Sequence, residues 1–177
     1  MSLLINMLLK NLINNIQKDK KKITITGLST NSKKVKKGHI FFAINGKSIN
    51  GEKFIKEAIN KGASVIVCSK KFKHKNKKIL IIKRKNIRNF VSKVSSRFYK
   101  LKPKNIIAVT GTNGKTSVAE LFYQILTLNN VPVASIGTLG VKFKNKILKT
   151  GLTSPDTISI HKYLQIIKKK KDGQCYY

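Results

Sequence analysis

Residues 106–117, IIAVTGTNGKTS, restrict what this chain can fold into more than any other part of it. Residues 106–109 are a short β-branched run of the kind that fills a buried parallel strand, and apolar residues then recur at helical spacing after Ser117. The glycine-containing loop therefore lies where a strand ends and a helix begins. Backbone N–H groups and the positive end of a helix dipole meet at such a junction, so we expect a phosphate site.

The residue types in this loop suit contact with a polyphosphate. Gly111 and Gly114 permit a close backbone approach that a β-carbon would obstruct. Lys115 can bring a point charge to the outer phosphates, and the Thr116 hydroxyl is placed to ligate Mg²⁺. The usual P-loop signature has a further glycine where this chain has Val109, so the loop departs from the general pattern but keeps its strand, loop and helix setting.

The spacing of apolar and turn-forming residues predicts an α/β fold around this loop. The expected strands are residues 23–27, 40–44, 63–68, 79–82, 106–109 and 133–136. Helices are expected at residues 3–16 and 87–101. Another helix, with Phe54, Ile55, Ala58 and Ile59 on its inner face, is expected to end at Gly62. The helix after the loop should stop at Asn129 and Asn130, and a last helix should run from Pro155 to Lys171 with Ser154 as its N-cap.

A domain boundary is expected at residues 100–104, where Pro103 breaks the preceding helix. Residues 1–102 and 105–177 are thus predicted to be separate domains. A chain of 177 residues with 41% hydrophobic content is large enough for a real core. We expect residues 1 to about 100 to fold, and residues 105–170 to stay loosely packed unless a partner completes a sheet around residues 106–109.

The charge of the chain favours a polyanionic partner if it is considered alone. Thirty-eight Lys and Arg stand against 6 Asp and Glu, which gives a formal net charge of +32. The lysines, however, are spread along the whole chain among Asn and Ile, without a stacking-aromatic pattern or a nucleic-acid module signature. A solvated lysine surface is the preferred interpretation, and a basic nucleic-acid-binding protein is the alternative.

Other classes of site find little support in the sequence. Cys68 and Cys175 are too few and too far apart for a metal cluster or a disulfide framework, and Cys68 is expected to pack as a small apolar residue. The three histidines have no metal-ligand spacing. This cysteine usage fits a reducing interior, and a cytoplasmic protein is expected. No apolar run approaches the length of a membrane span.

Residues 110–116, TGTNGKT, resemble the ATP-binding loop of the Mur ligases and of their folylpolyglutamate synthase relatives, in which the shortened spacing is typical. Residues 134–140, ASIGTLG, and 152–156, LTSPD, are similar to segments of the MurE branch of that family, and they favour it over the MurF branch. Upstream, residues 27–35 and 37–43 are similar to the substrate-binding amino-terminal domain of the same branch.

The resemblance implies a small UDP-binding α/β domain followed by the start of a P-loop central domain with a mainly parallel sheet. It implies ATP-dependent addition of diaminopimelate or lysine to UDP-N-acetylmuramoyl-L-Ala-D-Glu through an acyl phosphate, by a monomer that uses Mg²⁺. Carried over by motif, the ATP-binding residues are Gly111, Thr112, Asn113, Gly114, Lys115, Thr116 and Ser117, with Lys115 catalytic and Thr116 on the metal. The substrate-binding residues are Thr30, Ser32, Lys47, Ser48 and Ile49 at the UDP-sugar end, and Leu152, Thr153 and Ser154 near the peptide; Ser154 also fits a purely capping role.

The family has three domains, and against that pattern this chain is expected to be truncated or frame-shifted within the second. Its last residues, 171–177, do not resemble the corresponding segment of the family. The carboxyl-terminal domain, which selects the amino acid, would then be missing, and the chain alone is not expected to complete the reaction.

Overall fold

The computed structural model describes residues 5–46, 49–73, 79–143, 146–148 and 155–171. The chain divides into two compact units, residues 1–98 and residues 99–177. Lys47, Ser48, Leu152, Thr153 and Ser154 lie outside the described residues.

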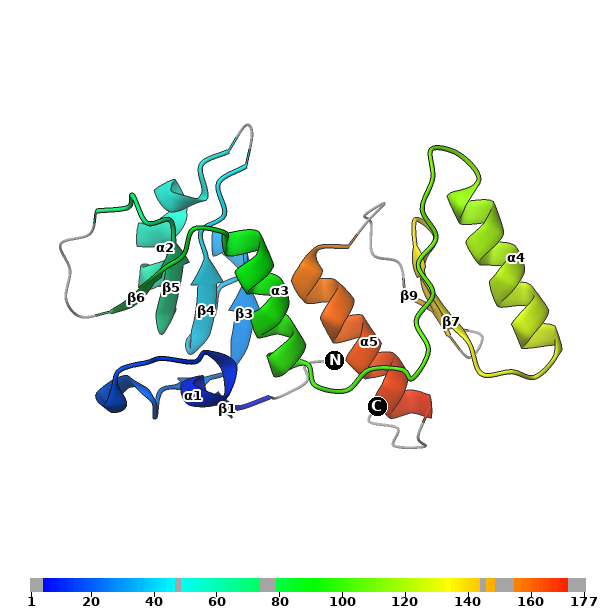
Figure 1. The fold of residues 1–177 in the computed structure, drawn as a ribbon, viewed down its shortest axis with the longest axis horizontal. Coiled ribbons are helices and arrows are strands. Elements are labelled where there is room, and N and C mark those ends of the chain that lie inside the picture. Colours follow the sequence, from blue (N-terminus) through cyan, green and yellow to red (C-terminus); the bar gives the residue numbers. More distant parts are fainter. Residues whose placement is uncertain (1–4, 47–48, 74–78, 144–145, 149–154, 172–177) are drawn as a thin grey trace. The chain divides into compact units, whose positions relative to one another are not determined.

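The first unit is built on a four-stranded parallel sheet in which the strands follow one another in chain order, β3-β4-β5-β6 (Figure 1). Two further strands, β1 and β2, form a small antiparallel pair. The elements of this unit are β1 (Met7–Leu8), α1 (Leu9–Leu12), η1 (Lys18–Lys20), β2 (Thr24–Ile25), β3 (Gly27–Ser29), η2 (Ser32–Lys34), β4 (His39–Phe42), η3 (Gly51–Phe54), α2 (Ile55–Asn60), β5 (Val65–Cys68), β6 (Leu80–Lys83) and α3 (Ile87–Phe98).

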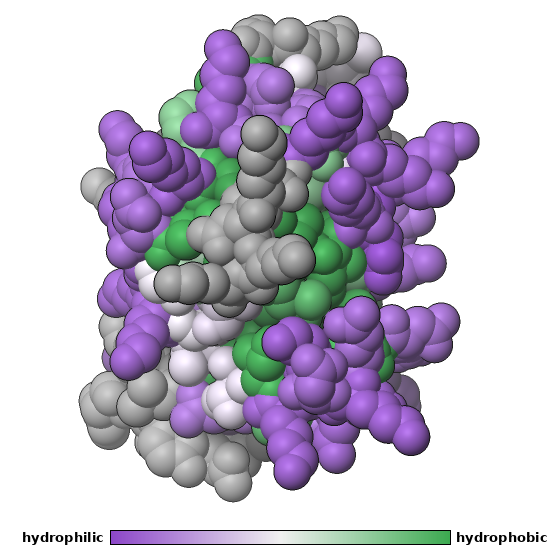
Figure 2. All heavy atoms as spheres, turned by 90° about the vertical axis from the view of Figure 1, so that its left-hand side faces the viewer, coloured by the Kyte–Doolittle hydropathy of each residue, from purple (hydrophilic) through white to green (hydrophobic). Residues whose placement is uncertain are grey.

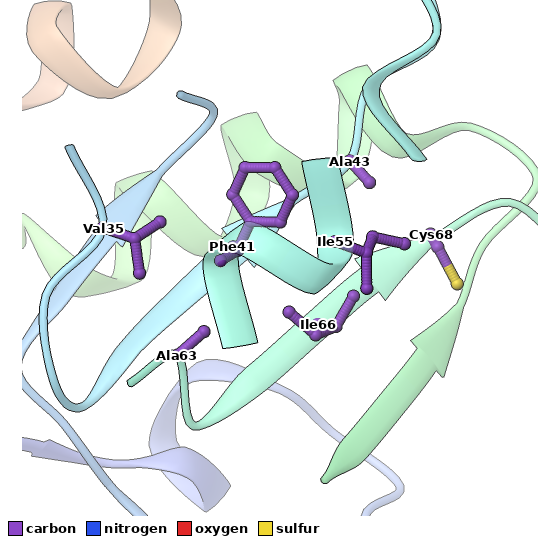
Figure 3. Close-up of a cluster of buried hydrophobic side chains, with 8 residues drawn as sticks. Val35, Phe41, Ala43, Ile55, Ala63, Ile66 and Cys68 are labelled. Carbon is purple, nitrogen blue, oxygen red and sulfur yellow. The ribbon is translucent and has the colours of Figure 1, made fainter. Parts of the chain in front are cut away.

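Both faces of this sheet are buried, as expected of parallel strands with continuous apolar runs. On one face, side chains of β4 and β5 pack with residues of α2 and the connecting loops (Figure 3). The residues of this cluster are Val35, Phe41, Ala43, Ile55, Ala58, Ala63, Ile66 and Cys68. The alternating residues Ile40, Phe42, Val65 and Val67 point to the opposite face and are also fully buried.

Two predictions for the amino-terminal part are wrong. Residues 3–16 do not form one helix, because Met7 and Leu8 pair with β2 and only the single turn of α1 follows. The pairing of β1 with β2 and the burial of Leu9 and Leu12 stabilise this arrangement more than the helical spacing of the apolar residues stabilises a long helix. Asparagines within residues 3–16 have low helix propensity and weaken that helix further. The predicted strand 23–27 is divided at Thr26 into the end of β2 and the start of β3. The Thr26 N–H donates to the Gly38 carbonyl, which lies outside any strand.

The predicted elements between residues 40 and 98 are confirmed with small shifts in their bounds. Gly62 ends α2 with a left-handed φ of +89°. Cys68 is fully buried, and burial raises the pKa of its thiol to about 11, so this cysteine packs as an apolar side chain. Phe54 is the exception to the predicted inner face of the helix, since 41% of it is exposed.

In its described residues, the second unit combines two helices with a three-stranded antiparallel sheet of order β7-β8-β9. Its elements are α4 (Lys115–Leu128), β7 (Ala134–Gly137), β8 (Gly140–Phe143), β9 (Lys146–Leu148) and α5 (Thr157–Lys171). The predicted helix after the loop, its stop at Asn129 and Asn130, and the turn between Gly137 and Gly140 are all confirmed.

The predicted parallel strand at residues 106–109 is not formed. These residues have no strand pairing among those described, and Ile106, Ile107 and Val109 are 58%, 68% and 41% exposed. A parallel strand needs neighbours on its edges, and the described sheet of this unit is an antiparallel meander instead. The expectation of a mainly parallel sheet in this unit is therefore wrong for the described residues.

Helix α5 begins two residues later than predicted. Asp156 caps it, since its Oδ1 accepts from the N–H groups of Ile158 (2.9 Å) and Ser159 (3.1 Å). Its other carboxylate oxygen, Oδ2, accepts from the Ser159 hydroxyl at 2.7 Å. A carboxylate at this position satisfies helix N–H groups that would otherwise have no partner, so Pro155 precedes the helix and does not form its first turn.

Candidate nucleotide and substrate site

The loop of residues 110–114 leads directly into α4, and glycines set its backbone. Gly111 has φ +149°, and Gly114, the N-cap residue, has φ +75° in the left-handed region. A β-carbon on Gly114 would meet nothing within 4 Å, so its conformation, and not crowding, is what favours glycine there. The loop is exposed throughout.

The amino-terminal end of α4 presents free hydrogen-bond donors. No acceptor for the N–H groups of Lys115, Thr116 and Ser117 exists within the described parts of the chain, and no side chain caps the helix. These N–H groups coincide with the positive end of the helix dipole. The arrangement fits an anion, and a polyphosphate in particular, because several donors lie side by side on one short loop.

Lys115 folds back over this loop. Its Nζ donates to the carbonyl oxygens of Gly111 at 2.5 Å and Thr112 at 3.0 Å. The ammonium group is thus held next to the donors of the helix terminus, and its partners among the described residues are neutral oxygens. The Thr116 hydroxyl is exposed, with no hydrogen-bond partner in the described regions, and so is available to ligate a metal ion.

An ion pair holds α4 to the sheet of its own unit. Lys142 on β8 donates to both carboxylate oxygens of Glu120, at 2.8 Å and 2.7 Å, and also lies over the Tyr123 ring at 5.9 Å. The hydrogen bond from Lys142 is the main cause that lowers the pKa of Glu120, with a second contribution from Gln124. The contact fixes the helix that follows the loop, and it was not among the features predicted from the sequence.

Of the substrate-binding residues predicted near the amino terminus, the described ones, Thr30, Ser32 and Ile49, lie at one edge of the parallel sheet. Thr30 follows β3 directly, and Ile49 lies in the reversal after β4, where the Gly46 N–H donates to the Ile49 carbonyl at 2.8 Å. Carboxyl ends of adjacent parallel strands share an edge, so the two residues lie on the same side of the sheet. Thr30 is half-buried, and Ile49 is 63% exposed.

Ser32 lies at the same edge but is already engaged. It is buried, and its hydroxyl donates to Glu57 Oε2 at 2.7 Å. This hydrogen bond is the largest cause that lowers the Glu57 pKa, followed by the one from Lys61 Nζ at 2.9 Å. Ser32 can therefore offer a ligand its oxygen as an acceptor, while its proton orients the loop against α2.

Sequence reasoning missed two acidic residues that shape this edge. Glu57 orients Ser32, and Glu52 Oε1 accepts from the N–H of Ser69 at the end of β5 at 2.9 Å. One signal was present: these are two of only 6 acidic residues in the whole chain. A carboxylate that is rare in so basic a sequence is a candidate for a specific contact.

Comparison with known proteins agrees with the division into these two units. The family description "Mur ligase family, catalytic domain" matches residues 24–99, and "Mur ligase middle domain" matches residues 109–175. The first match covers the parallel-sheet unit from β2 to α3, and the second begins just before the glycine loop.

Three similar curated proteins share the name UDP-N-acetylmuramoyl-L-alanyl-D-glutamate--2,6-diaminopimelate ligase. The protein of that name from Zymomonas mobilis is 42% identical over 135 residues, which are 76% of this chain and 27% of the relative. Those from Rickettsia bellii and Clostridium tetani are each 39% identical over 161 residues, covering 88% and 87% of this chain. This chain thus spans between 27% and 33% of the length of these three relatives.

A solved structure of a ligase with this name is similar in fold. It superposes with a TM-score of 0.75 at 24% identity and covers 94% of this chain and 34% of its own. In the described regions, no helix of the present structure is long and apolar enough to cross a membrane.

Proposed function

Since the chain belongs to the Mur ligase family, we propose that it contributes the nucleotide loop and the UDP-substrate domain of a ligase in peptidoglycan precursor synthesis. The reaction is ATP-dependent addition of an amino acid to UDP-N-acetylmuramoyl-L-Ala-D-Glu. The names of the curated relatives support diaminopimelate as the amino acid added, in preference to lysine. We further propose that the reaction takes place in the cytoplasm and that the protein acts as a monomer.

In the proposed reaction, the γ-carboxylate of D-Glu attacks the γ-phosphorus of ATP, and ADP leaves. The amino group of the incoming amino acid then attacks the acyl carbon and a C–N bond forms. Inorganic phosphate leaves with the electron pair of the broken C–O bond, and the nitrogen loses a proton to solvent. In both steps negative charge develops on phosphate oxygens. The protein must therefore supply fixed hydrogen-bond donors and cations to stabilise it.

The loop residues provide those groups in this proposal. The N–H groups of Lys115, Thr116 and Ser117 receive phosphate oxygens, and the Lys115 ammonium leaves the Gly111 and Thr112 carbonyls to neutralise the outer phosphate. Thr116 holds Mg²⁺, which when bound offsets the negative charge of the outer phosphates.

The first unit binds the nucleotide end of the acceptor substrate in this proposal. Thr30, the Ser32 oxygen and Ile49 receive the UDP-sugar portion together with Lys47 and Ser48, while Leu152, Thr153 and Ser154 contact its peptide. The placement of Thr30, Ser32 and Ile49 at the carboxyl ends of adjacent parallel strands supports this, because ligands of open α/β sheets bind at that edge.

One observation carries the proposal more than any other: a left-handed glycine at the N-cap of α4 leaves three helix N–H groups without acceptors, among the described residues, beside an ammonium group. The experiment that tests it is calorimetric titration of the full chain with Mg²⁺ and a non-hydrolysable ATP analogue. We expect binding in the wild type, and a loss of about tenfold or more in affinity for Lys115→Ala, because charge-assisted hydrogen bonds are lost.

Lys146→Ala is the matched control, because Lys146 is an exposed lysine of the same unit on β9. Its affinity should equal that of the wild type. The proposal fails if folded wild-type protein takes up no nucleotide, or if both lysine variants weaken binding equally, which would indicate attraction by general positive charge.

A further inference from the structure

Two adjoining hollows lie in the first unit, beside the last strand of its sheet. One has a volume of about 250 Å³ and lies between α3 and the segment after α1. The other, of about 320 Å³, lies between the same segment and β6. Both are lined by Ile13, Asn15 and Arg84, so they adjoin, and we call the two together the β6 groove.

The β6 groove is cationic and has no carboxylate in its lining. Lys83, Arg84, Lys93 and Arg97 line it. Salt bridges among the described residues join Lys20 to Asp19, Lys61 to Glu57 and Lys142 to Glu120, so none of them involves a groove residue. Two guanidinium groups and two ammonium groups therefore face the groove without an acidic partner in the described chain.

The arginines of the groove are held in place by neutral groups. Arg84 lies over the Phe90 ring at 4.7 Å, and its Nη1 donates to the Lys83 carbonyl at 3.0 Å. Arg97 Nη1 donates to the Leu12 carbonyl at 2.9 Å and to Asn14 Oδ1 at 3.0 Å. These contacts use one nitrogen of each guanidinium group and leave other N–H groups available to an anion.

One wall of the groove is the free edge of the parallel sheet. β6 is the last strand of the sheet, and the Arg84 N–H points back to the Cys68 carbonyl of β5. Backbone groups alternate along a strand, so the N–H groups of Ile81 and Lys83 point away from β5 into the groove. Neither has an acceptor within the described residues, which leaves these backbone donors open to a further strand.

The opposite wall does not close this edge. Among the described backbone hydrogen bonds, none joins residues 13–17 to β6, and the hollow of about 320 Å³ separates them. The apolar part of this hollow's lining is aliphatic, from Ile13, Ile16, Leu80, Ile81 and Ile82, and the polar side chains of Asn15 and Gln17 also line it. On the side of the molecule where β6 lies, hydrophobic surface is bordered by hydrophilic side chains (Figure 2).

We propose that the β6 groove binds an extended acidic segment of another polypeptide, which adds to the free edge of β6 as a further strand. Backbone donors of β6 pair with its main chain, its aliphatic side chains pack on the isoleucine-lined floor, and its carboxylates meet Arg84, Lys93 and Arg97. Single-stranded nucleic acid fits less well, since Phe90, the aromatic ring of the lining, already has Arg84 over it and the rest of the apolar lining is aliphatic.

The probe is a synthetic heptapeptide, Glu-Val-Glu-Ile-Glu-Val-Glu, blocked at both ends and titrated by fluorescence anisotropy into the full chain. Strand addition requires the outward N–H of Lys83, so Lys83→Pro should bind about fivefold more weakly than Lys83→Ala, which removes the same charge but keeps that donor. Equal binding by the two variants would overturn the proposal.

A modified peptide tests strand addition on the wild-type protein, so the test does not depend on the folding of the Lys83→Pro variant. Methylation of alternate backbone nitrogens removes the donors of one edge of the peptide without changing its charge. We expect the wild type to lose affinity for the form methylated on the edge that faces β6. Unchanged affinity for both methylated forms would refute strand addition whatever the variant does.

The charge requirement is tested separately at low salt. Arg84→Gln and Lys93→Gln should each weaken peptide binding by about threefold, whereas Arg88→Gln, an exposed arginine on α3 outside the groove lining, should bind like the wild type. The proposal would be overturned if all three variants lost the same affinity. It would also be overturned if a uridine decamer displaced the peptide at a lower concentration than unlabelled peptide does. Either result would indicate general attraction of polyanions.

Discussion

Gly27 faces His39 across the β3–β4 pair, and no β-carbon fits between them. A β-carbon built at Gly27 would lie 2.5 Å from His39 Nε2. We therefore predict that Gly27→Ala lowers the free energy of unfolding by about 1–3 kcal/mol, the usual cost of overpacking. Urea denaturation of the two proteins measures the difference.

Gly46→Ala is the matched control for this prediction. Its β-carbon would have only the Ile49 carbonyl nearby, at 3.5 Å, which is ordinary contact. The free energy of unfolding should change by less than about 0.5 kcal/mol. If Gly27→Ala is as stable as Gly46→Ala, the His39 ring can move aside freely and the close approach has no structural cost.

His39 itself should make stability depend on pH. Burial, and to a lesser extent the charge of Lys36, lowers its pKa in the folded state, and its Nδ1 is buried without a hydrogen-bond partner among the described residues. As pH falls below the ordinary histidine pKa, the unfolded chain binds a proton before the folded chain does, so stability is lost. We expect His39→Phe to lose less stability than the wild type between about pH 7 and pH 5.5 in urea titrations, and an identical loss in both proteins would contradict this.

At the scale of residues, the sequence was most informative where the backbone itself has a special conformation. Gly114 and Gly62 were predicted to sit at a helix start and a helix end, and both have a positive φ. The Ser32–Glu57 hydrogen bond was not predictable, because it joins positions 25 apart that only the fold brings together. The assignment of ligands to these residues stays a prediction.

At the scale of elements, the start of α5 depends on Asp156. Its carboxylate oxygen Oδ1 accepts two helix N–H groups, so Asp156→Ala should destabilise the first turn by about 1 kcal/mol, while Asp156→Asn keeps an acceptor and should cost little. Amide exchange of Ile158 and Ser159 by NMR measures this. Equal exchange rates in the Ala and Asn variants would show that the cap is not needed.

Elements with local causes were predicted, and elements with distant causes were not. The helix α4 follows from its own spacing, and the β7–β8 hairpin follows from Gly137 and Gly140. Residues 106–109 have the composition of a buried strand, but composition does not supply the neighbouring strands that bury it. The helical prediction for residues 3–16 was wrong for the same reason, because it could not anticipate the pairing of β1 with β2, whose paired residues are 16 to 18 positions apart in the chain.

At the scale of the whole molecule, the two units should differ in protection from solvent. Strands β4 and β5 consist mostly of fully buried residues, whereas no residue of α4 is buried and Leu121, Phe122 and Ile125 are 58%, 43% and 57% exposed. A helix that buries no apolar side chain is marginal in water, even when an ion pair holds it to a neighbouring strand. We predict fast amide exchange over residues 105–130 and slow exchange in β4 and β5, measured by mass spectrometry on the monomeric chain. Uniformly slow exchange across residues 105–170 would contradict it.

The order of strands in the first unit also has a consequence for biosynthesis. Each of β3, β4, β5 and β6 pairs with its neighbour in the chain, so no strand must wait for a distant partner. A nascent polypeptide emerging from the ribosome can therefore extend this sheet one strand at a time, in the order of translation, with short closure loops at each step. Circular permutants that open the chain between β4 and β5 should retain the same final sheet but refold more slowly in stopped-flow measurements, since β4 and β5 would then lie at opposite ends of the chain and their pairing would have to close a long loop.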